Sequence, residues 1–446
     1  MSNNSEPIFD FTPAGRCRVE ALFDEPQVTS DAGAVLVREL LERSELLRDI
    51  AAALDDDRRA GSVRHPALNI LRQRVAQICC GYLKADDGDR LRHDPAMVLA
   101  SGGVPGEDAL ASQPTVSRLE NRATVRTLLG VGYAFVADYI RSFGGKPPKT
   151  VILDMDPTAI TVYGQQQMAL FNGFEDEYCL MPFHVYDGAN GRLIATVIRP
   201  GKTPTAREIL AILKRIVRRL RAAWPTVAIV FRADSHHTKP SVMEWLEANS
   251  IHYVTGLGPN AWLDAQFALT IQRARAFRDE TLREVRLYAS GHYAAESWNG
   301  QYRRVICRVV AGPLGVDTRY IVTSIDQPGA KQLYETVYCD RGNAELMIKD
   351  HKLDLGSIHA SRHQATANQF RLFLHSAAYT LMHRLREALK GTELQHARFS
   401  TLQVRLLKVG ARVERTPRRI RFHLPATFAL KDVFARLAAA FLPLRT

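Results

Sequence analysis

The chain has 446 residues, of which 46% are hydrophobic and 24% are charged, a balance that excludes a disordered protein and leaves room for two or three domains. Its net charge of +12 favours a polyanion as the binding partner. No apolar run reaches the ~18 residues of a membrane-spanning helix, no secretion signal is found, and the six cysteines form no Cys-x-x-Cys pair. We therefore expect a cytoplasmic protein without a membrane anchor, zinc site or disulfide framework.

The first third of the chain is predicted to be helical. Ala34 to Leu54 and Pro66 to Leu83 carry apolar residues at three- and four-residue spacing, and Gly-Gly-Lys-Pro-Pro at 144–148 then breaks the pattern. We predict a helical N-terminal DNA-binding region over residues 1–149. Within it, Ser112 to Arg118 has the composition of a recognition helix in a helix-turn-helix, although ordinary helix starts share that composition.

A β-rich stretch follows, in which strands and helices alternate. Its order is three strands, helix, strand, helix, strand, which is the order of the ribonuclease-H-like (RNase-H-like) fold, where acids at strand ends share metal ions. We therefore predict an α/β protein with an RNase-H-like catalytic domain over residues 150–383. The expected elements are strands Val151–Asp156, Tyr178–Tyr186 and Leu193–Ile198, helix Thr205–Ala223, strand Val227–Arg232, helix Ser241–Asn249 and strand His252–Leu257, with a hairpin-like turn at 187–191.

Two of these strands end in acidic residues. Asp154 and Asp156 alternate along the first strand, so both point to the same face, and Asp234 ends the apolar strand that begins near Val227. Acids at the ends of buried strands are also satisfied by helix N-termini or arginines, so a single acid does not decide the matter. His236 and His237, which follow Asp234, are candidates either for proton carriers or for structural residues.

A third acid lies on a helix predicted over residues 331–353. At ~100° per residue, Tyr338, Glu345 and Lys352 fall within about 60° of Arg341 on the helix surface. A solvated helix face would also be polar. One acid among two cations and a phenol nevertheless suits a metal ligand beside groups that hold phosphates.

The stretch between Asp234 and Glu345 is longer than one helix and one strand require. We predict a β-rich insertion over about residues 258–333, with a helix near 261–280 followed by strands. Trp298 lies in a turn of this insertion. It is a candidate for stacking on an unpaired base, and the alternative is that it packs the hairpin against the core.

Most of the excess positive charge lies near the C-terminus. Residues 384–421 hold eleven Lys and Arg against three Glu, and counterion release from DNA phosphates would exploit such clustering. We predict a basic, helical C-terminal region over residues 384–446, in which the apolar residues of 402–407 form a packed side. The candidate DNA contacts on the exposed side are Arg415, Arg418 and Arg419.

The spacing of Tyr338, Arg341, Glu345 and Lys352 resembles the Tyr-Arg-Glu-Lys signature of bacterial insertion-sequence transposases. Further motifs resemble one branch, the insertion-sequence family numbered thirteen-eighty, over roughly residues 50–390. Several ordered motifs are more specific than any one of them. These motifs are Leu-Arg-Gln-Arg-Val (71–75), Gly-Tyr (81–82), Leu-Arg-His-Asp-Pro (91–95), Leu-Ala-Ser-Gln-Pro-Thr-Val-Ser-Arg-Leu-Glu-Asn (110–121), Leu-Asp-Met-Asp-Pro-Thr (153–158), Arg-Ala-Asp-Ser (232–235) and Ala-Asn-Gln-Phe-Arg-Leu (367–372).

The resemblance implies an RNase-H-like core that holds two divalent ions, Mg²⁺ or Mn²⁺, with an Asp-Asp-Glu triad. Carried over residue by residue, the triad is Asp156, Asp234 and Glu345, and Asp154 is the alternative for the first acid. In related cut-and-paste transposases, a β insertion handles a hairpinned DNA end. The residues implied to contact phosphates near the cleaved end are Tyr338, Arg341 and Lys352.

The resemblance also implies a function. It predicts a DNA transposase that binds terminal repeats as a homodimer in a synaptic complex and catalyses strand cleavage and strand transfer, associated with the nucleoid when bound to DNA. The alternatives are an inactive or domesticated DNA-binding regulator and a stand-alone RNase-H-like nuclease. Loss of a triad acid would mark the regulator, and none is lost here.

Overall fold

A computed structural model describes residues 8–54, 56, 58, 61 and 63–442. The chain divides into two compact units. Among the described helices, none combines the length and the apolar character needed to cross a membrane. Unit 1 comprises Met1–Arg43, Gly61–Val116 and Leu385–Thr446, and unit 2 comprises Ser44–Ala60 and Ser117–Arg384.

Unit 1 contains both ends of the chain. Strand β15 (Ala411–Thr416) pairs antiparallel with β16 (Arg419–His423) on one side and with β3 (Val28–Thr29) on the other. The predicted C-terminal region over residues 384–446 thus folds with the start of the chain instead of forming a region of its own, and the N-terminal part of this unit ends at Val116 and not at residue 149. The unit's other elements are β1 (Phe9–Ala14), β2 (Cys17–Ala21), α1 (Ala34–Arg43), α3 (Ala67–Cys79), α4 (Asp87–Arg90), α5 (Pro95–Ala100), α15 (Phe399–Leu402), a π-helical turn (Gln403–Leu407) and α16 (Lys431–Phe441).

The expected packed side of the C-terminal region is present. Leu402, Leu406 and Leu407 are fully buried, whereas Val404 is 69% exposed. The region is therefore folded and not a tail. It contains helices α15 and α16, as a helical region requires, but also the β15–β16 hairpin, which was not predicted.

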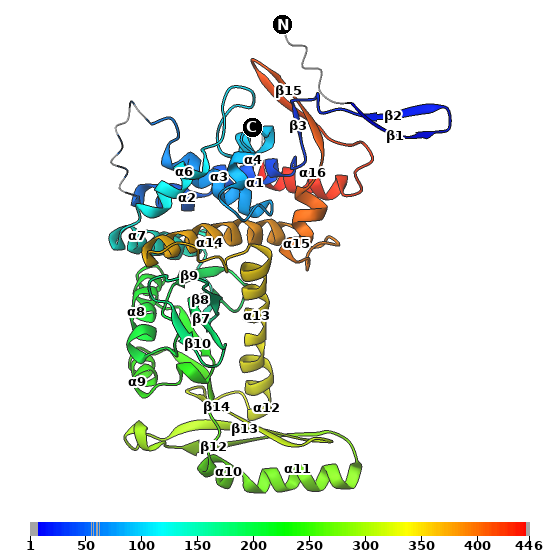
Figure 1. Cartoon of the computed structure of the whole chain (residues 1–446). Helices are drawn as coiled ribbons and strands as arrows, with labels where there is room; N and C mark the ends of the chain where they lie inside the picture. Colours follow the sequence, from blue (N-terminus) through cyan, green and yellow to red (C-terminus); the bar gives the residue numbers. More distant parts are fainter. Residues whose placement is uncertain (1–7, 55, 57, 59–60, 62, 443–446) are drawn as a thin grey trace. The chain divides into compact units, whose positions relative to one another are not determined.

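Unit 2 is built on a mixed sheet (Figure 1). Its central strands are β4 (Thr150–Pro157), β8 (Phe183–Asp187), β9 (Leu193–Val197), β10 (Ala228–Ala233) and β11 (His252–Leu257). They lie in the order β11-β10-β4-β8-β9, in which β4, β10 and β11 are parallel and β8 is antiparallel to both β4 and β9. Helices α8 (Ala206–Ala223) and α9 (Pro240–Ala248) connect the parallel strands, so the predicted order of elements is confirmed.

One predicted strand is split. The expected strand Tyr178–Tyr186 is divided into β7 (Glu177–Leu180) and β8, because Pro182 between them has no N–H to donate to a ladder. β7 instead joins a small sheet with β5 (Ile160–Thr161) and β6 (Leu170–Asn172).

The predicted insertion contains the expected helix and strands. Its strand β14 pairs antiparallel with β11, so the insertion extends the central sheet to eight strands. Its elements are α10 (Ala261–Gln266), α11 (Ala268–Thr281), β12 (Val285–Tyr293), β13 (Arg303–Gly312) and β14 (Gly315–Thr323).

The helical segment that follows the insertion is irregular. Its middle and end widen into π-helical turns at Leu333–Tyr338 and Asp350–Asp354, around α13 (Gly342–Lys349). The even ~100° spacing used to align Tyr338, Arg341, Glu345 and Lys352 therefore does not hold along the segment. The remaining helices are α2 (Glu45–Ala53), α6 (Gln113–Asn121), α7 (Val125–Arg141), α12 (Ala330–Gln332) and α14 (Ala365–Ala388).

An ion pair is buried between the two central parallel strands. Asp154 on β4 and Arg232 on β10 are level in the sheet, and Arg232 donates from Nε and Nη2 to the two carboxylate oxygens at 2.6 and 2.7 Å. Gly188 leaves room for the pair, because a Cβ there would lie 2.3 Å from both Arg232 Nη2 and Asp154 Oδ2. Arg232 also donates to the carbonyl oxygen of Val337 at 2.7 Å, which fastens the irregular helical segment to the sheet.

Breaking this pair should destabilise unit 2 strongly. We expect Asp154→Asn to lower the free energy of unfolding by about 3–5 kcal/mol, because it leaves the Arg232 charge buried and uncompensated. The control is Glu284→Gln, which breaks the exposed pair of Glu284 with Arg286 and should cost at most about 1 kcal/mol. Urea unfolding of both variants measures the difference, and equal losses would contradict the assignment.

Candidate active site

The register of the central strands brings two acids to the same level. Asp154 pairs with Arg232 in the parallel ladder, and the same register carried two residues further sets Asp156 level with Asp234. Neighbouring strands lie about 4.8 Å apart. Both acids therefore stand at the carboxyl end of the parallel strands, where loops leave the sheet.

Asp156 lies in an unfavourable electrostatic environment. Its side chain is 16% exposed, and its carboxylate contacts Arg341 at 3.3 Å. Burial, opposed by Arg341 and assisted by the negative charges of Asp234 and Glu345, raises the pKa of Asp156 to about 7. The charges of all three predicted triad acids thus act on one another.

Asp234 is held by its own loop. Its carboxylate Oδ1 accepts hydrogen bonds from the backbone N–H of His236 at 2.9 Å and from the ring of His237, Nδ1 to Oδ1, at 2.7 Å. Burial acts to raise the pKa of Asp234, but the His237 hydrogen bond and nearby positive charges outweigh it and lower the pKa below its usual value. His237 is fully buried, with its ring beside Phe183, which favours the structural role for His237; His236 is exposed.

The helical segment brings Tyr338 and Arg341 to these acids. A Cβ on Gly256 of β11 would lie 3.0 Å from the Tyr338 hydroxyl and 2.9 Å from the backbone nitrogen of Ser235, so this glycine lets the phenol approach the loop after Asp234. Burial raises the pKa of Tyr338, with Arg341 opposing and Asp234 adding to the rise. Of the two, Arg341 makes the direct contact with a triad acid.

Glu345 and Lys352 occupy less enclosed positions. Glu345 is exposed on α13, and Lys352 is half-buried in the following π-helical turn. His184 on β8 is the strand partner of Asp156. Burial, with a smaller effect of the Lys352 charge, lowers the pKa of His184 to about 3. The ring of His184 lies 5.0 Å from that of His351, the neighbour of Lys352, so this end of the helical segment lies beside the β4–β8 ladder.

The donor set has the chemistry of a divalent-metal site, but its members are engaged with protein groups. Carboxylate oxygens suit Mg²⁺ and Mn²⁺, and a dication would relieve the repulsion that raises the pKa of Asp156. Among the described residues, no three His, Cys, Asp or Glu side chains are grouped closely enough to hold a metal ion. Arg341 lies against Oδ2 of Asp156, and the His236 N–H and the His237 ring both donate to Oδ1 of Asp234.

The alternative first acid, Asp154, is placed differently. Its side chain is fully buried and both of its oxygens accept from Arg232. Burial, opposed by these hydrogen bonds, raises the pKa of Asp154 to about 6, so the carboxyl group is ionised at neutral pH. Each oxygen of Asp154 accepts from Arg232 away from solvent, whereas only Oδ2 of Asp156 contacts Arg341, so Asp156 is the more accessible of the two acids.

Trp298 is not available for stacking on DNA. It is only 3% exposed, packs edge-to-face on Tyr293, and has the Arg303 guanidinium 5.3 Å from its ring. The predicted DNA-binding role of Trp298 is therefore wrong, and the alternative of core packing is correct. Among the described residues of the insertion, the exposed aromatic side chains are Trp262 (79%), Tyr302 (74%) and Phe277 (49%). Nothing in the sequence around Trp298 distinguished it from them.

The three basic residues proposed near the C-terminus do not share a face. In the β15–β16 hairpin, Arg415 lies opposite Ile420 on the apolar face and pairs with Glu107. Arg419 lies on the other face, and Arg418 is in the turn. The sequence analysis did not single out the other arginines on the face that carries Arg419. Alternation along the two strands of the hairpin would have identified them. They are Arg412 and Arg421.

Comparisons with known proteins were made for the whole chain. A family model described as "Transposase DDE domain group 1" matches residues 11–446. None of the curated proteins compared with the chain matches it. A solved structure of the piggyBac transposase synaptic complex with hairpin DNA is similar, with 10% sequence identity and a TM-score of 0.42 over 94% of this chain and 86% of that chain.

The two strand-end acids should affect the stability of the metal-free protein with opposite signs. The raised pKa of Asp156 means that the folded state loses stability as pH rises from about 4 to about 7, so Asp156→Asn should raise the unfolding midpoint at pH 8 more than at pH 5. The lowered pKa of Asp234 means the reverse, so Asp234→Asn should lower the midpoint at pH 8. At about 1.4 kcal/mol per pKa unit, the effect of Asp156 between pH 5 and pH 8 amounts to about 3 kcal/mol. Thermal unfolding in a chelator measures both, and changes of the same sign would contradict these environments.

Proposed function

The chain belongs to the family of group 1 transposase DDE domains, and we propose that it is a bacterial insertion-sequence transposase that cuts DNA at terminal repeats and transfers the freed 3′ ends to target DNA. The observation that carries the proposal is that two acids stand level at the carboxyl end of the central strands, within electrostatic range of a third. Asp156 and Asp234 stand level on adjacent strands, and the charge of Glu345 reaches Asp156. Such a cluster of acids is costly unless cations compensate it.

We assign the centre of unit 2 to the RNase-H-like fold. Support comes from the five central strands. Numbered 1 to 5 along the chain (β4, β8, β9, β10, β11), they lie across the sheet in the order 3-2-1-4-5. Strand 2 is antiparallel to strands 1 and 3, and strands 4 and 5 are parallel to strand 1. In that fold the acids stand where Asp156 and Asp234 stand here. The β12–β14 insertion is then an edge extension of the catalytic sheet.

Asp156, Asp234 and Glu345 would hold two Mg²⁺ or Mn²⁺ ions. When bound, such a pair of ions supplies an activated water or 3′-hydroxyl and stabilises the leaving oxygen of the phosphodiester. The protein's own part is to place the oxygens: His237 and the His236 N–H orient Asp234. Arg341 compensates the charge of Asp156 in the metal-free protein through a contact with Oδ2, and it would give up this contact if a metal ion took that oxygen.

The same positions suit a phosphate backbone. Tyr338 and Arg341 border the acids, and Lys352 lies at the end of the helical segment beside the β4–β8 ladder. An arginine released from Asp156 can donate two parallel hydrogen bonds to a phosphate. We therefore propose that Arg341 exchanges a carboxylate partner for DNA, and that Tyr338 and Lys352 hold the neighbouring phosphates.

The proposed partners are DNA and a second copy of the chain. The net charge of +12 supports a DNA partner. A transposase must bring two transposon ends together, and one copy of the chain on each end would make the complex a homodimer. An inactive regulator would bind the same ends without cutting, and a stand-alone nuclease would cut without joining, so the products distinguish all three.

Removing a proposed metal ligand should abolish cutting but not binding. We expect Asp234→Asn and Glu345→Gln to reduce cleavage of terminal-repeat DNA at least about 1,000-fold in Mg²⁺, since the ions lose a ligand. Affinity for the same DNA should change less than about threefold, because it comes mainly from Lys and Arg on phosphates. Sequencing gels and binding titrations measure the two effects.

The matched control lies on the same helical segment. Glu335→Gln removes an exposed acid that accepts from the Tyr288 hydroxyl and should keep wild-type cleavage. Wild-type cleavage by Glu345→Gln, or a loss in Glu335→Gln equal to that in Glu345→Gln, would refute the assignment of Glu345. Failure of all proteins to cut, with binding intact, would favour the regulator.

The exposed face of the β15–β16 hairpin should contribute to DNA affinity without sequence preference. We expect the triple change Arg412→Ala, Arg419→Ala and Arg421→Ala to weaken binding and to flatten the plot of log affinity against log salt by about 0.9 for each DNA phosphate that the variant no longer neutralises. Arg415→Ala is the control, because Arg415 lies on the other face with Glu107. An unchanged slope in the triple variant would exclude this face from the DNA interface.

A further inference from the structure

An exposed β-ribbon lies near the N-terminus. β1 and β2 form a two-stranded sheet of their own, and every residue of both strands is exposed. An isolated two-stranded hairpin is at best marginally stable in water. The ribbon therefore needs a surface that the described part of the chain does not provide.

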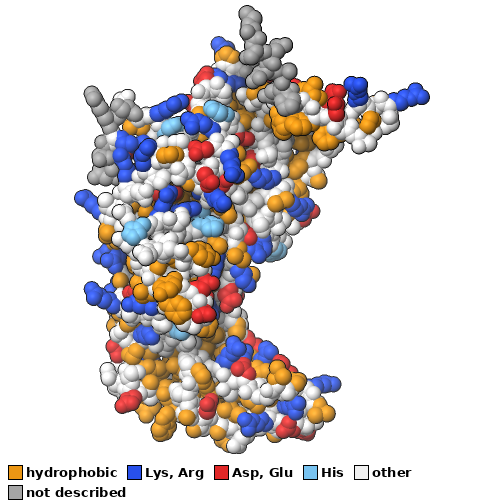
Figure 2. Space-filling model, viewed as in Figure 1, with side chains coloured by type: hydrophobic (Ala, Val, Ile, Leu, Met, Phe, Trp, Pro, Cys, Tyr) orange, Lys and Arg blue, Asp and Glu red, His pale blue; other side chains and the backbone are white. Residues whose placement is uncertain are grey.

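One face of the ribbon is apolar. The register sets Phe9 opposite Ala21 and Phe11 opposite Val19, so these side chains share a face. The ring of Phe23, just after β2, packs edge-to-face on Phe9 with 5.8 Å between centroids, yet Phe23 is 81% exposed. The ribbon, at the upper right of Figure 2, presents hydrophobic side chains at the surface. A contiguous exposed apolar face of this kind marks an interaction site.

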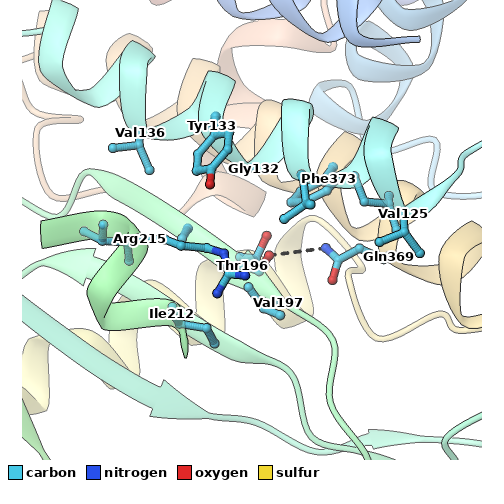
Figure 3. Close-up of a pocket in the computed structure, with 14 residues that line it drawn as sticks. Val125, Gly132, Tyr133, Val136, Thr196, Val197, Ile212, Arg215, Gln369 and Phe373 are labelled. Carbon is cyan, nitrogen blue, oxygen red and sulfur yellow. Dashed lines mark hydrogen bonds between the residues drawn. The ribbon is translucent and has the colours of Figure 1, made fainter. Parts of the chain in front are cut away.

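A pocket of matching character lies in unit 2. It holds about 220 Å³ between α7, α8, β9 and α14, and its lining is almost entirely apolar (Figure 3). Val125 and Leu129, which line it, are 67% and 44% exposed. An apolar cavity of about 150 Å³ already accommodates a benzene ring. The pocket is thus large enough for one phenylalanine ring.

The side of the pocket formed by α8 is basic. Arg215 lines the pocket, and Tyr133, which also lines it, accepts a hydrogen bond from Arg218 at 3.4 Å and lies 3.7 Å from the Arg219 guanidinium. Arg215, Arg218 and Arg219 have no carboxylate partner among the residues that the structure describes. An occupant should therefore combine an aromatic ring with adjacent acids.

The ribbon supplies this combination. Asp24 and Glu25 directly follow Phe23. We propose that the ribbon of one copy docks on unit 2 of a second copy, with the Phe23 ring in the pocket and the carboxylates of Asp24 and Glu25 at Arg215 and Arg218. Two copies related by a twofold axis make this contact twice, once in each direction. This inference rests on the proposed homodimer. Its test needs neither DNA nor metal, so the docking contact and the proposed transposase activity can be refuted independently.

Charge reversal on the two surfaces tests the contact. One variant carries Asp24→Lys and Glu25→Lys, and the other carries Arg215→Glu and Arg218→Glu. By sedimentation velocity of the full chain without DNA, each variant alone should dimerise at least about tenfold more weakly than wild type, because like charges then face each other. An equimolar mixture should recover wild-type dimerisation, because both contacts regain opposite charges. The control is Arg207→Glu with Lys214→Glu, the same charge change on α8 outside the pocket, which should dimerise normally.

Photocrosslinking identifies the partner chain. With p-benzoylphenylalanine in place of Phe23, an equimolar mixture of ¹⁴N- and ¹⁵N-labelled protein should give crosslinks to residues 125–136 that join the two isotopes. Crosslinks only within one isotope, crosslinks elsewhere or a monomeric wild-type protein would overturn the proposal. So would α8 variants that lose DNA affinity while they dimerise normally, since the basic rim would then serve DNA.

Discussion

Two charged side chains, buried at the centre of the sheet, hold together the elements that carry the proposed active-site residues. Arg232 neutralises Asp154 across the β4–β10 ladder and also donates to the carbonyl oxygen of Val337. One guanidinium therefore joins two strands and the helical segment that carries Tyr338 and Arg341. Burying such a pair is favourable only when the hydrogen bonds are nearly ideal. Gly188 makes that geometry possible by leaving the space that a Cβ would fill.

Near this pair, the negative charges of Asp234 and Asp156 are compensated to different degrees, and the difference suits the proposed chemistry. Asp234 receives two hydrogen bonds from its own loop, which stabilise its ionised form. Asp156 is buried near two other acids, with Arg341 as its one direct counter-charge. A metal ion bound at Asp156 would therefore be stabilised by negative charge that the metal-free protein compensates only in part. If Arg341 leaves Asp156 when a metal ion binds there, its guanidinium becomes free to bind a DNA phosphate, so metal binding and DNA binding would be coupled.

Much of the fold was predictable because its signals are local. Alternation and helical spacing gave the order of strands and helices from β4 to β11, and a Pro-interrupted stretch accounts for the one strand that was split. The joining of β15 to β3 had no such signal, because pairing between residues near 28 and near 411 is decided only when the chain folds. The π-helical turns around α13 were also missed, since a periodicity analysis assumes regular helix geometry.

In the candidate site, too, some features could be predicted from the sequence and others were decided only by the fold. The sequence by itself was enough to select Asp156, Asp234 and Glu345 as candidates, because each stands in one of the ordered motifs on which the resemblance rests. It left Asp154 and Asp156 equivalent, since alternation along a strand places both on one face. Tertiary structure separated them by setting Arg232 beside Asp154, and it likewise buried Trp298 and turned Arg415 away from Arg419. Residue type and spacing are properties of the chain, whereas the partner that neutralises a charge or covers a ring comes from a distant segment and exists only in the folded protein.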